Sequence, residues 1–294
     1  VRLRVRNREG PGMVEQKNLM QLVWTTDPHL NHVPVNAWER WVEANRSAQP
    51  QGILITGDIS EGDDVVFQLQ RIAESLPCPI YFVLGNHDFY QSSIAQTRRH
   101  VIEACRDHPR LFYLTDLDPV EMPGGVFLLG DDGWGDGTVG DYQGSPVRIN
   151  DFELIEEFKT AAPSHWKQLL RDQGEQSARR LEHKLRILPD GTQSVIVLTH
   201  VPPFREACWY QGHTTDDHWA PFFVCGEVGK VLLAAASERP TCTITVLCGH
   251  THNGGVAKLS ENLIVYTGGA DYGEPVVEGI VQIVGKVEVR RRIT

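Results

Sequence analysis

Three polar side chains of different chemistry follow one another in the sequence at Asn86, His87 and Asp88. They offer an amide oxygen, an imidazole and a carboxylate, groups that can coordinate a metal ion or move a proton. The apolar run Tyr81–Leu84 and then Gly85 precede them, which is typical of a buried strand that ends in a sharp turn. Because parallel strands deliver residues at their carboxyl ends to the ligand-binding crevice of an α/β sheet, we expect these side chains in a functional site.

Side chains that can bind metal stand in the same position after four more apolar runs. With Asn86, the full set of predicted metal ligands is Asp27, His29, Asp58, Asn86, His200, His250 and His252. Carboxylate and imidazole groups together favour manganese, iron or zinc over calcium or magnesium alone. Seven ligands exceed the coordination of one ion, so the set predicts two adjacent divalent ions that share one carboxylate. In an extended backbone, ligands two residues apart, such as Asp27 and His29, would point to the same face.

The order of these residues resembles a known family. The motifs Asp27-x-His29, Gly57-Asp58, Gly85-Asn86-His87-Asp88, His200 and Gly249-His250-x-His252 are similar to those of the calcineurin-like metallophosphoesterases, and they span residues 27–252. The resemblance implies that Asp27, His29 and His252 hold a first ion, that Asp58 bridges both ions, and that Asn86, His200 and His250 hold a second. It further implies that His87 faces the scissile phosphate as a catalytic residue. Asp88 would be its partner and would set the imidazole tautomer.

The implied reaction is hydrolysis of a phosphoric ester. Two divalent ions lower the pKa of a bridging water, and the resulting hydroxide attacks phosphorus without a side-chain nucleophile. The substrate would be a small molecule with a phosphodiester or phosphomonoester bond, nucleotides among the candidates. Asp58 continues into Ile59-Ser60-Glu61-Gly62, unlike the protein serine/threonine phosphatases, and the branch implied is similar to the class III cyclic-nucleotide phosphodiesterases. Two alternatives stay open: an interaction scaffold with this fold, and a nuclease of the same superfamily.

Two stretches after predicted strand ends are candidates for shaping the substrate pocket. Asp131 lies in the first, although a turn or structural role is equally consistent with its position. The second carries Arg205, Trp209 and Tyr210, where an aromatic ring could stack on a base and the guanidinium could contact phosphate. The charged helix predicted over 164–188 is interpreted as solvated.

The composition is that of an ordinary globular protein, with 294 residues and 41% hydrophobic content. The net charge of −10 argues against a nucleic-acid partner. No apolar run predicts a membrane segment, and six cysteines without CxxC spacing favour reduced thiols in a cytoplasmic protein. The sequence leaves the oligomeric state open.

Helices alternate with strands in the first half of the chain, and strands dominate the end. The predicted fold class is α/β (an α+β sandwich): two packed mixed β-sheets flanked by helices, in the metallophosphoesterase-like αββα arrangement. The first sheet is expected to be largely parallel, and the final strands suggest a second, more antiparallel sheet. We expect residues 1–12 to be an extension without function, Met13 to be the natural start, and residues 13–294 to form a single domain.

Overall fold

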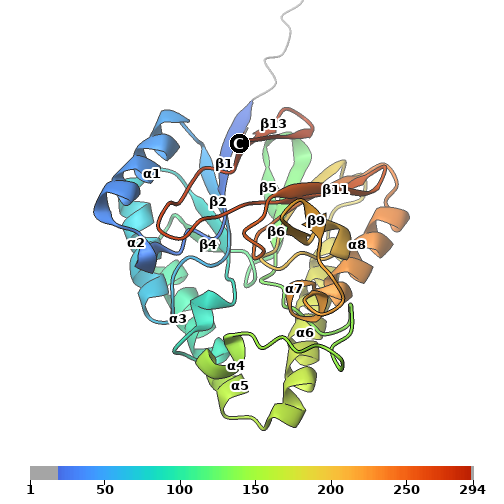
Figure 1. Cartoon of the computed structure of the whole chain (residues 1–294). Helices are drawn as coiled ribbons and strands as arrows, with labels where there is room; N and C mark the ends of the chain where they lie inside the picture. Colours follow the sequence, from blue (N-terminus) through green and yellow to red (C-terminus); the bar gives the residue numbers. More distant parts are fainter. Residues whose placement is uncertain (1–18, 293–294) are drawn as a thin grey trace, which may run out of the picture.

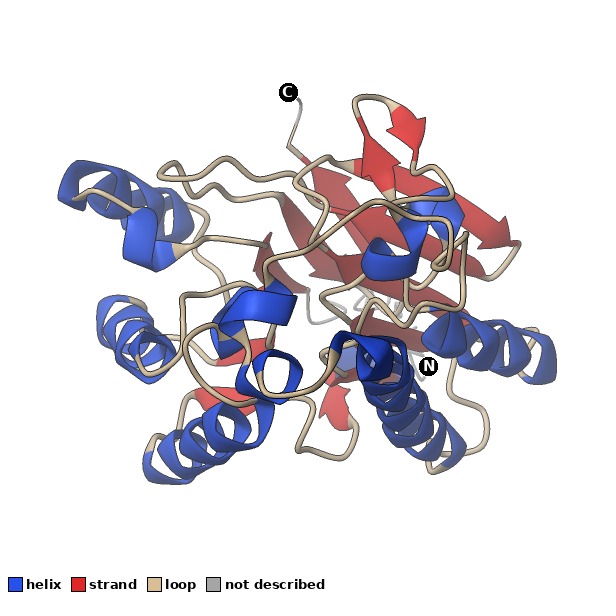
Figure 2. Cartoon of the chain, turned by 60° about the horizontal axis from the view of Figure 1, so that its bottom comes forward, coloured by secondary structure: helices blue, strands red, loops and turns tan. Residues whose placement is uncertain are grey.

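The computed structural model describes residues 19–292. Two six-stranded sheets pack face to face in the middle of the molecule, and helices cover the outer face of each sheet (Figures 1 and 2). The predicted αββα sandwich is therefore confirmed. The predicted extension over residues 1–12 lies outside the described residues.

The first sheet has four parallel strands with an antiparallel pair at one edge. In spatial order it contains β14 (Val287–Arg291), β13 (Gly279–Ile283), β1 (Met20–Thr25), β2 (Gly52–Thr56), β3 (Ile80–Val83) and β4 (Leu111–Tyr113). Every residue of β2 and β3 is buried. This burial explains why these strands read as continuous apolar runs, because a parallel strand in a sandwich is covered on both faces.

The second sheet also has a parallel centre, but it carries one antiparallel strand at each edge. Its order is β11 (Gly255–Ser260), β12 (Leu263–Thr267), β10 (Thr243–Cys248), β7 (Ser194–Leu198), β6 (Val126–Gly130) and β5 (Val120–Met122), with antiparallel pairing only at the two edges. The expectation of a more antiparallel second sheet was wrong. The C-terminal strands divide between the sheets, because β12 pairs with β10 whereas β13 pairs with β1.

Helices flank the sandwich on both sides. On the first sheet lie α1 (Val35–Ser47), α2 (Asp64–Ser75) and α3 (Ile94–Asp107), and on the second lie α6 (Trp166–Arg186) and α8 (Gly226–Glu238). Shorter elements are α4 (Asp151–Leu154), α5 (Glu156–Lys159), α7 (Ala220–Phe223) and the hairpin of β8 (Trp209–Tyr210) and β9 (His213–Thr214). In the described part of the chain, no helix has both the length and the apolar character that crossing a membrane requires.

The two inner sheet faces form a separate apolar core. Leu22, Trp24 and Leu54 from the first sheet pack with Leu128 and Ile196 from the second. This layer fixes the two sheets against each other. The predicted metal ligands come directly after the carboxyl ends of five strands, namely β1, β2, β3, β7 and β10.

Candidate metal centre

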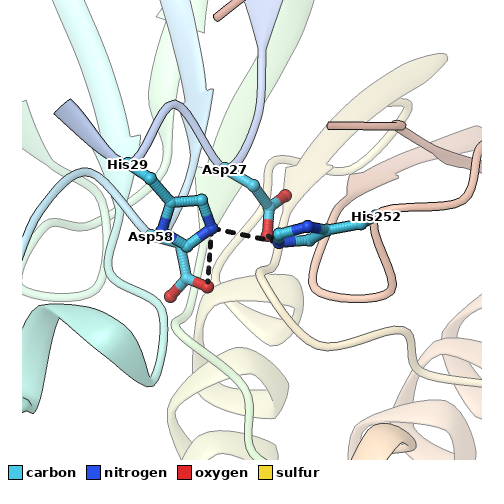
Figure 3. Close-up of side chains that lie close together, drawn as sticks. All are labelled: Asp27, His29, Asp58 and His252. Carbon is cyan, nitrogen blue, oxygen red and sulfur yellow. Dashed lines mark hydrogen bonds and ion pairs between the residues drawn. The ribbon is translucent and has the colours of Figure 1, made fainter. Parts of the chain in front are cut away.

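Four of the predicted ligands gather into a first group beyond the ends of β1, β2 and β10. One donor atom from each of Asp27, His29, Asp58 and His252 lies within 4.8 Å of the others. The Nε2 atoms of His29 and His252 are 3.0 Å apart, and His29 Nε2 lies 3.8 Å from Asp58 Oδ2 (Figure 3). Asp27 Oδ1 lies 3.5 Å from His252 Nε2. The first group is thus a compact set of carboxylate oxygens and imidazole nitrogens.

A second group shares Asp58 with the first. Donor atoms of Asp58, His200 and His250 again lie within 4.8 Å of one another. His200 Nε2 is 3.4 Å from Asp58 Oδ1 and 3.1 Å from His250 Nδ1. Asn86 joins this group, because its Oδ1 lies 3.2 Å from His200 Nε2. All seven predicted ligands therefore meet, and the Asp58 carboxylate lies between the two groups.

The backbone places these side chains by an unexpected route. Five of the seven predicted ligands have left-handed φ values: Asp27 (45°), His29 (40°), Asp58 (52°), His250 (71°) and His252 (55°). The expectation of an extended backbone at the Asp-x-His and His-x-His spacings was wrong. A residue with left-handed φ turns the chain sharply just after a strand. The side chains on either side of the turn can therefore point toward the same cluster of donor atoms. Left-handed conformations are strained for residues other than glycine, and they concentrate at functional sites.

Two glycines allow the close approach of neighbouring ligand loops. A Cβ atom on Gly85 would collide with the Asp58 carboxylate and the His200 ring. A Cβ atom on Gly249 would collide with the Asp27 carboxylate. These positions explain why a glycine directly precedes Asn86 and His250 in the sequence.

Burial keeps two of the imidazoles neutral. It lowers the pKa of His29 to about 3, against the opposing attraction of Asp58. Burial and the neighbouring His200 lower the pKa of His250 to about 3. A neutral imidazole has a lone pair available for a metal, which its protonated form does not have.

The carboxylate shared by the two groups stays ionised. Burial favours protonation of Asp58, but the surrounding histidines, His200 foremost, outweigh it and lower its pKa. Burial opposes a charge on His200, but Asp58 and Asp27 outweigh it and raise its pKa, so a cation bound at this ring would displace a proton. His200 Nδ1 lies 2.8 Å from the carbonyl oxygen of Thr56 and is placed to donate to it, so Nε2 is the nitrogen that faces the cluster. An anionic carboxylate with imidazole nitrogens on both sides of it in a buried site fits a pair of divalent cations.

His87 lies beside the first group, but its predicted partner is elsewhere. The His87 backbone N–H donates to Asp58 Oδ1 at 2.9 Å, and its ring lies 4.7 Å from the His29 ring. His87 Nδ1 is buried and has no hydrogen-bond partner among residues 19–292. The His87 ring therefore does not donate the expected hydrogen bond to Asp88.

Asp88 is occupied by backbone groups instead. Its Oδ1 accepts from the N–H groups of Ile59 and Ser60, at 2.8 and 2.9 Å, and its Oδ2 accepts from Gly85 N–H at 2.7 Å. The predicted role of Asp88 in setting the His87 tautomer was wrong. Residues His87–Phe89 form a single 3-10 turn, and the carboxylate meets buried amides that need an acceptor.

Three residues near the centre were missed at the sequence level. Asn86 Nδ2 donates to Asp151 Oδ1 at 2.8 Å, and the Tyr90 hydroxyl donates to the same oxygen at 2.9 Å. These contacts turn the amide so that its oxygen faces His200. The Tyr272 ring lies 4.4 Å from that of His29, and burial together with Asp58 raises its pKa to about 12. Proximity to His87 could have drawn attention to Tyr90, whereas nothing local marks the other two.

The remaining candidates divide between structure and surface. Asp131 is buried and makes a bidentate ion pair with Arg180 of α6, at 2.7 and 3.0 Å, so its role is structural. Arg205 pairs with the exposed Asp217. Trp209 packs against Gly255, and the ring of Tyr210 is exposed.

Comparison with known proteins identifies a family and a fold. The family model described as calcineurin-like phosphoesterase matches residues 20–254. The fold is similar to that of phosphopantetheinyl hydrolase from Mycobacterium tuberculosis, with a TM-score of 0.63, 13% identity and coverage of 87% of this chain and 91% of that one. A dimetal phosphatase from Danio rerio is also similar, with a TM-score of 0.56, 13% identity and coverage of 93% and 96%. A search of curated protein sequences gave no significant match.

Proposed function

Because this chain belongs to the calcineurin-like phosphoesterase family, we propose that it is a hydrolase that uses two divalent metal ions to cleave a phosphoester bond of a small molecule. One observation carries the proposal: two groups of buried donor atoms share the carboxylate of Asp58. A shared carboxylate is the arrangement that holds two ions close enough to act on one phosphate.

Each ligand has an assigned place in this proposal. Asp27, His29 and His252 would hold the first ion, Asn86, His200 and His250 would hold the second, and Asp58 would be shared by both. When bound, the ions would supply Lewis acidity toward the phosphate oxygens and activate water as the nucleophile. The donor set of carboxylate, amide and imidazole favours manganese, iron or zinc.

The protein contributes orientation and proton transfer through its own side chains. Asp151 and Tyr90 fix the amide of Asn86. His87 lines a cavity of about 410 Å³, together with Glu61, Tyr90 and Tyr272. We call this space the His87 cavity. A proton held on the His87 ring can be given there to the departing oxygen of the substrate.

The test combines metal content with turnover. Manganese-loaded protein is expected to bind two ions per chain and to hydrolyse bis-p-nitrophenyl phosphate or p-nitrophenyl phosphate. Asp58→Asn weakens the bridging ligand and should reduce both occupancy and rate. Asp63→Asn is the matched control, because Asp63 is exposed and its carboxylate pairs with His100 on the surface. Two bound ions without turnover of either ester would refute the hydrolase and favour a scaffold.

A further inference from the structure

A second cavity lies on the His250 side of the centre and is distinct from the His87 cavity. Its volume is about 350 Å³, and its walls are the hairpin β8–β9, the segment that leads into α7, and Thr251. The hairpin and α7 lie near each other on the side of the second sheet (Figure 1). Its aromatic lining residues are Trp209, Tyr210, His213, Trp219 and Phe223. We call this space the aromatic cavity.

The aromatic cavity adjoins the metal ligands directly. The Phe223 ring lies 4.4 Å from the His250 ring, and Trp219 packs edge-on against Phe223 at 5.6 Å. Thr251, which also lines the cavity, stands between the two predicted ligands His250 and His252. A group bound in this cavity would therefore lie next to the phosphate site.

The hairpin wall is tied to the ligand loop. Gln211 N–H donates to Asn253 Oδ1 at 3.0 Å, and Asn253 Nδ2 donates to the carbonyl oxygen of Thr251 at 2.8 Å. Gly255 has no side chain, which lets the Trp209 ring pack directly on β11. These contacts hold the aromatic wall at a fixed position relative to His250 and His252.

The chemistry of the lining favours an uncharged planar ring. Tyr210 and Trp219 remain 61% and 49% exposed, so their ring faces are available to a ligand. The described residues that line the cavity include no lysine or arginine, and nearby Arg205 is paired with Asp217. The carboxylate of Asp216 already accepts from the N–H groups of His218 and Trp219. A phosphate would find no cation here, whereas a nucleobase can stack on the rings and reach the exposed Thr214, which also lines the cavity.

We propose that the aromatic cavity binds a nucleoside arm of the substrate, and that this arm stays on the phosphate after cleavage. This inference rests on the proposed hydrolase function. The departing oxygen must lie near His87, which lines the other cavity. A substrate with an organic departing group in the His87 cavity and its retained nucleoside in the aromatic cavity has two organic groups on the phosphate that is cleaved, and is therefore a diester.

The decisive experiment compares two esters that share a leaving group. Thymidine 5′-(p-nitrophenyl) phosphate and methyl p-nitrophenyl phosphate both release p-nitrophenolate and differ only in the arm that is retained. Wild-type protein should prefer the thymidine ester. Trp219→Ala and Tyr210→Ala should lower kcat/KM for the thymidine ester by about 5- to 150-fold, the usual scale of lost base stacking, and change it less than about 2-fold for the methyl ester. Tyr210→Phe keeps the ring and should retain the preference.

A second readout needs neither metal nor turnover. Thymidine 5′-monophosphate should quench tryptophan fluorescence of the metal-free protein, and Trp219→Ala should weaken its binding. If the hydrolase proposal fails, neither ester is turned over by wild type, but this titration still reports on the cavity. An unchanged ester preference in both alanine variants would overturn the inference, as would an equal loss on both esters. Affinity that rises with the length of a thymidine oligonucleotide would overturn the small-molecule assignment and favour a strand.

Discussion

Replacing Asp151 by alanine is expected to weaken ion binding at the group that contains Asn86 and to spare the group that contains Asp27. The Asp151 carboxylate is buried, and one of its oxygens accepts both the Asn86 amide N–H, at 2.8 Å, and the Tyr90 hydroxyl, at 2.9 Å. An amide has an oxygen on one side and an NH₂ on the other. Holding the NH₂ on Asp151 therefore directs the oxygen toward His200.

The size of the effect follows from what alanine removes. The variant loses a hydrogen bond to a carboxylate partner, worth about 1.5–3 kcal/mol, and leaves the amide free to turn its NH₂ toward the ion. About 1.4 kcal/mol is a factor of ten, so the expected loss is about 10- to 100-fold in affinity. That range is also typical for removing the partner that orients a metal ligand. Tyr90→Phe keeps the bond from Asn86 to Asp151 and should cost less.

Calorimetric titration of metal-free protein with Mn²⁺ measures this effect. The dissociation constant of one binding step should rise, while that of the other step stays within about 2-fold of wild type. Thermal unfolding of the metal-free variant controls for general damage, since Asp151 is buried. Unchanged constants at both steps would refute the orienting role, and an equal rise at both steps would show that the substitution acts through the fold.

Three further changes test the centre and the fold around it. His87→Asn keeps the backbone N–H that donates to Asp58 and removes the proton donor, so steady-state assays should show kcat lower by about 10²- to 10⁴-fold with metal content unchanged. Chelation should lower the unfolding temperature, because ions that bind only the native state stabilise it by about 2.7 kcal/mol at a free concentration of 100 times Kd, and scanning calorimetry with and without Mn²⁺ measures the shift. Burial favours protonation of Asp132, but Arg98 and the Tyr113 hydroxyl outweigh it and lower its pKa from 3.8. Its contribution to stability is therefore complete above pH 3.8 and is lost as pH falls through the folded-state pKa, so urea unfolding of metal-free Asp132→Asn should show lower stability at pH 7 and a weaker decline in acid than wild type.

The residues that meet in the centre were predictable because local sequence and sheet geometry agree there. Each ligand motif follows an apolar run, and parallel strands present their carboxyl ends at a common edge. That rule places Asp58 after β2 and His200 after β7 without knowledge of the strand order. The rule does not predict the backbone conformation of the turn after each strand. His250 has a left-handed φ because the chain must turn sharply after β10 to bring its side chain to the other ligands.

The partners of the C-terminal strands could not be read from their pattern. Alternation in 279–283 indicates a strand with one face more buried than the other. It does not indicate which neighbour supplies the hydrogen bonds. The antiparallel pairing of β13 with β1 joins residues more than 250 positions apart, such as Met20 and Ile283.

Charge was a poor guide to exposure along α6. The helix was expected to be solvated, yet Lys184 is only 4% exposed, and its Nζ donates to the carbonyl oxygens of Leu114, Thr115 and Gly130 at 2.6–3.0 Å. Arg180 similarly reaches Asp131 at the end of β6. Buried strand ends leave carbonyl and carboxylate groups that need donors, and long basic side chains of a covering helix can supply them. That need appears only once the helix lies on the sheet.

Asp88 was predicted to orient His87, but its contacts instead stabilise the loops that carry the metal ligands. Left-handed turns at Asp58 and its neighbours in the cluster cost about 1–2 kcal/mol each, so other contacts must hold them in place. Asp88 supplies three such contacts: it accepts from Ile59 and Ser60, which follow Asp58, and from Gly85, which precedes Asn86. One carboxylate thus joins the loop after β2 to the loop after β3. The spacing between Asp58 and Asn86 is then set by the protein before any ion arrives, which is what a preorganised two-ion site requires.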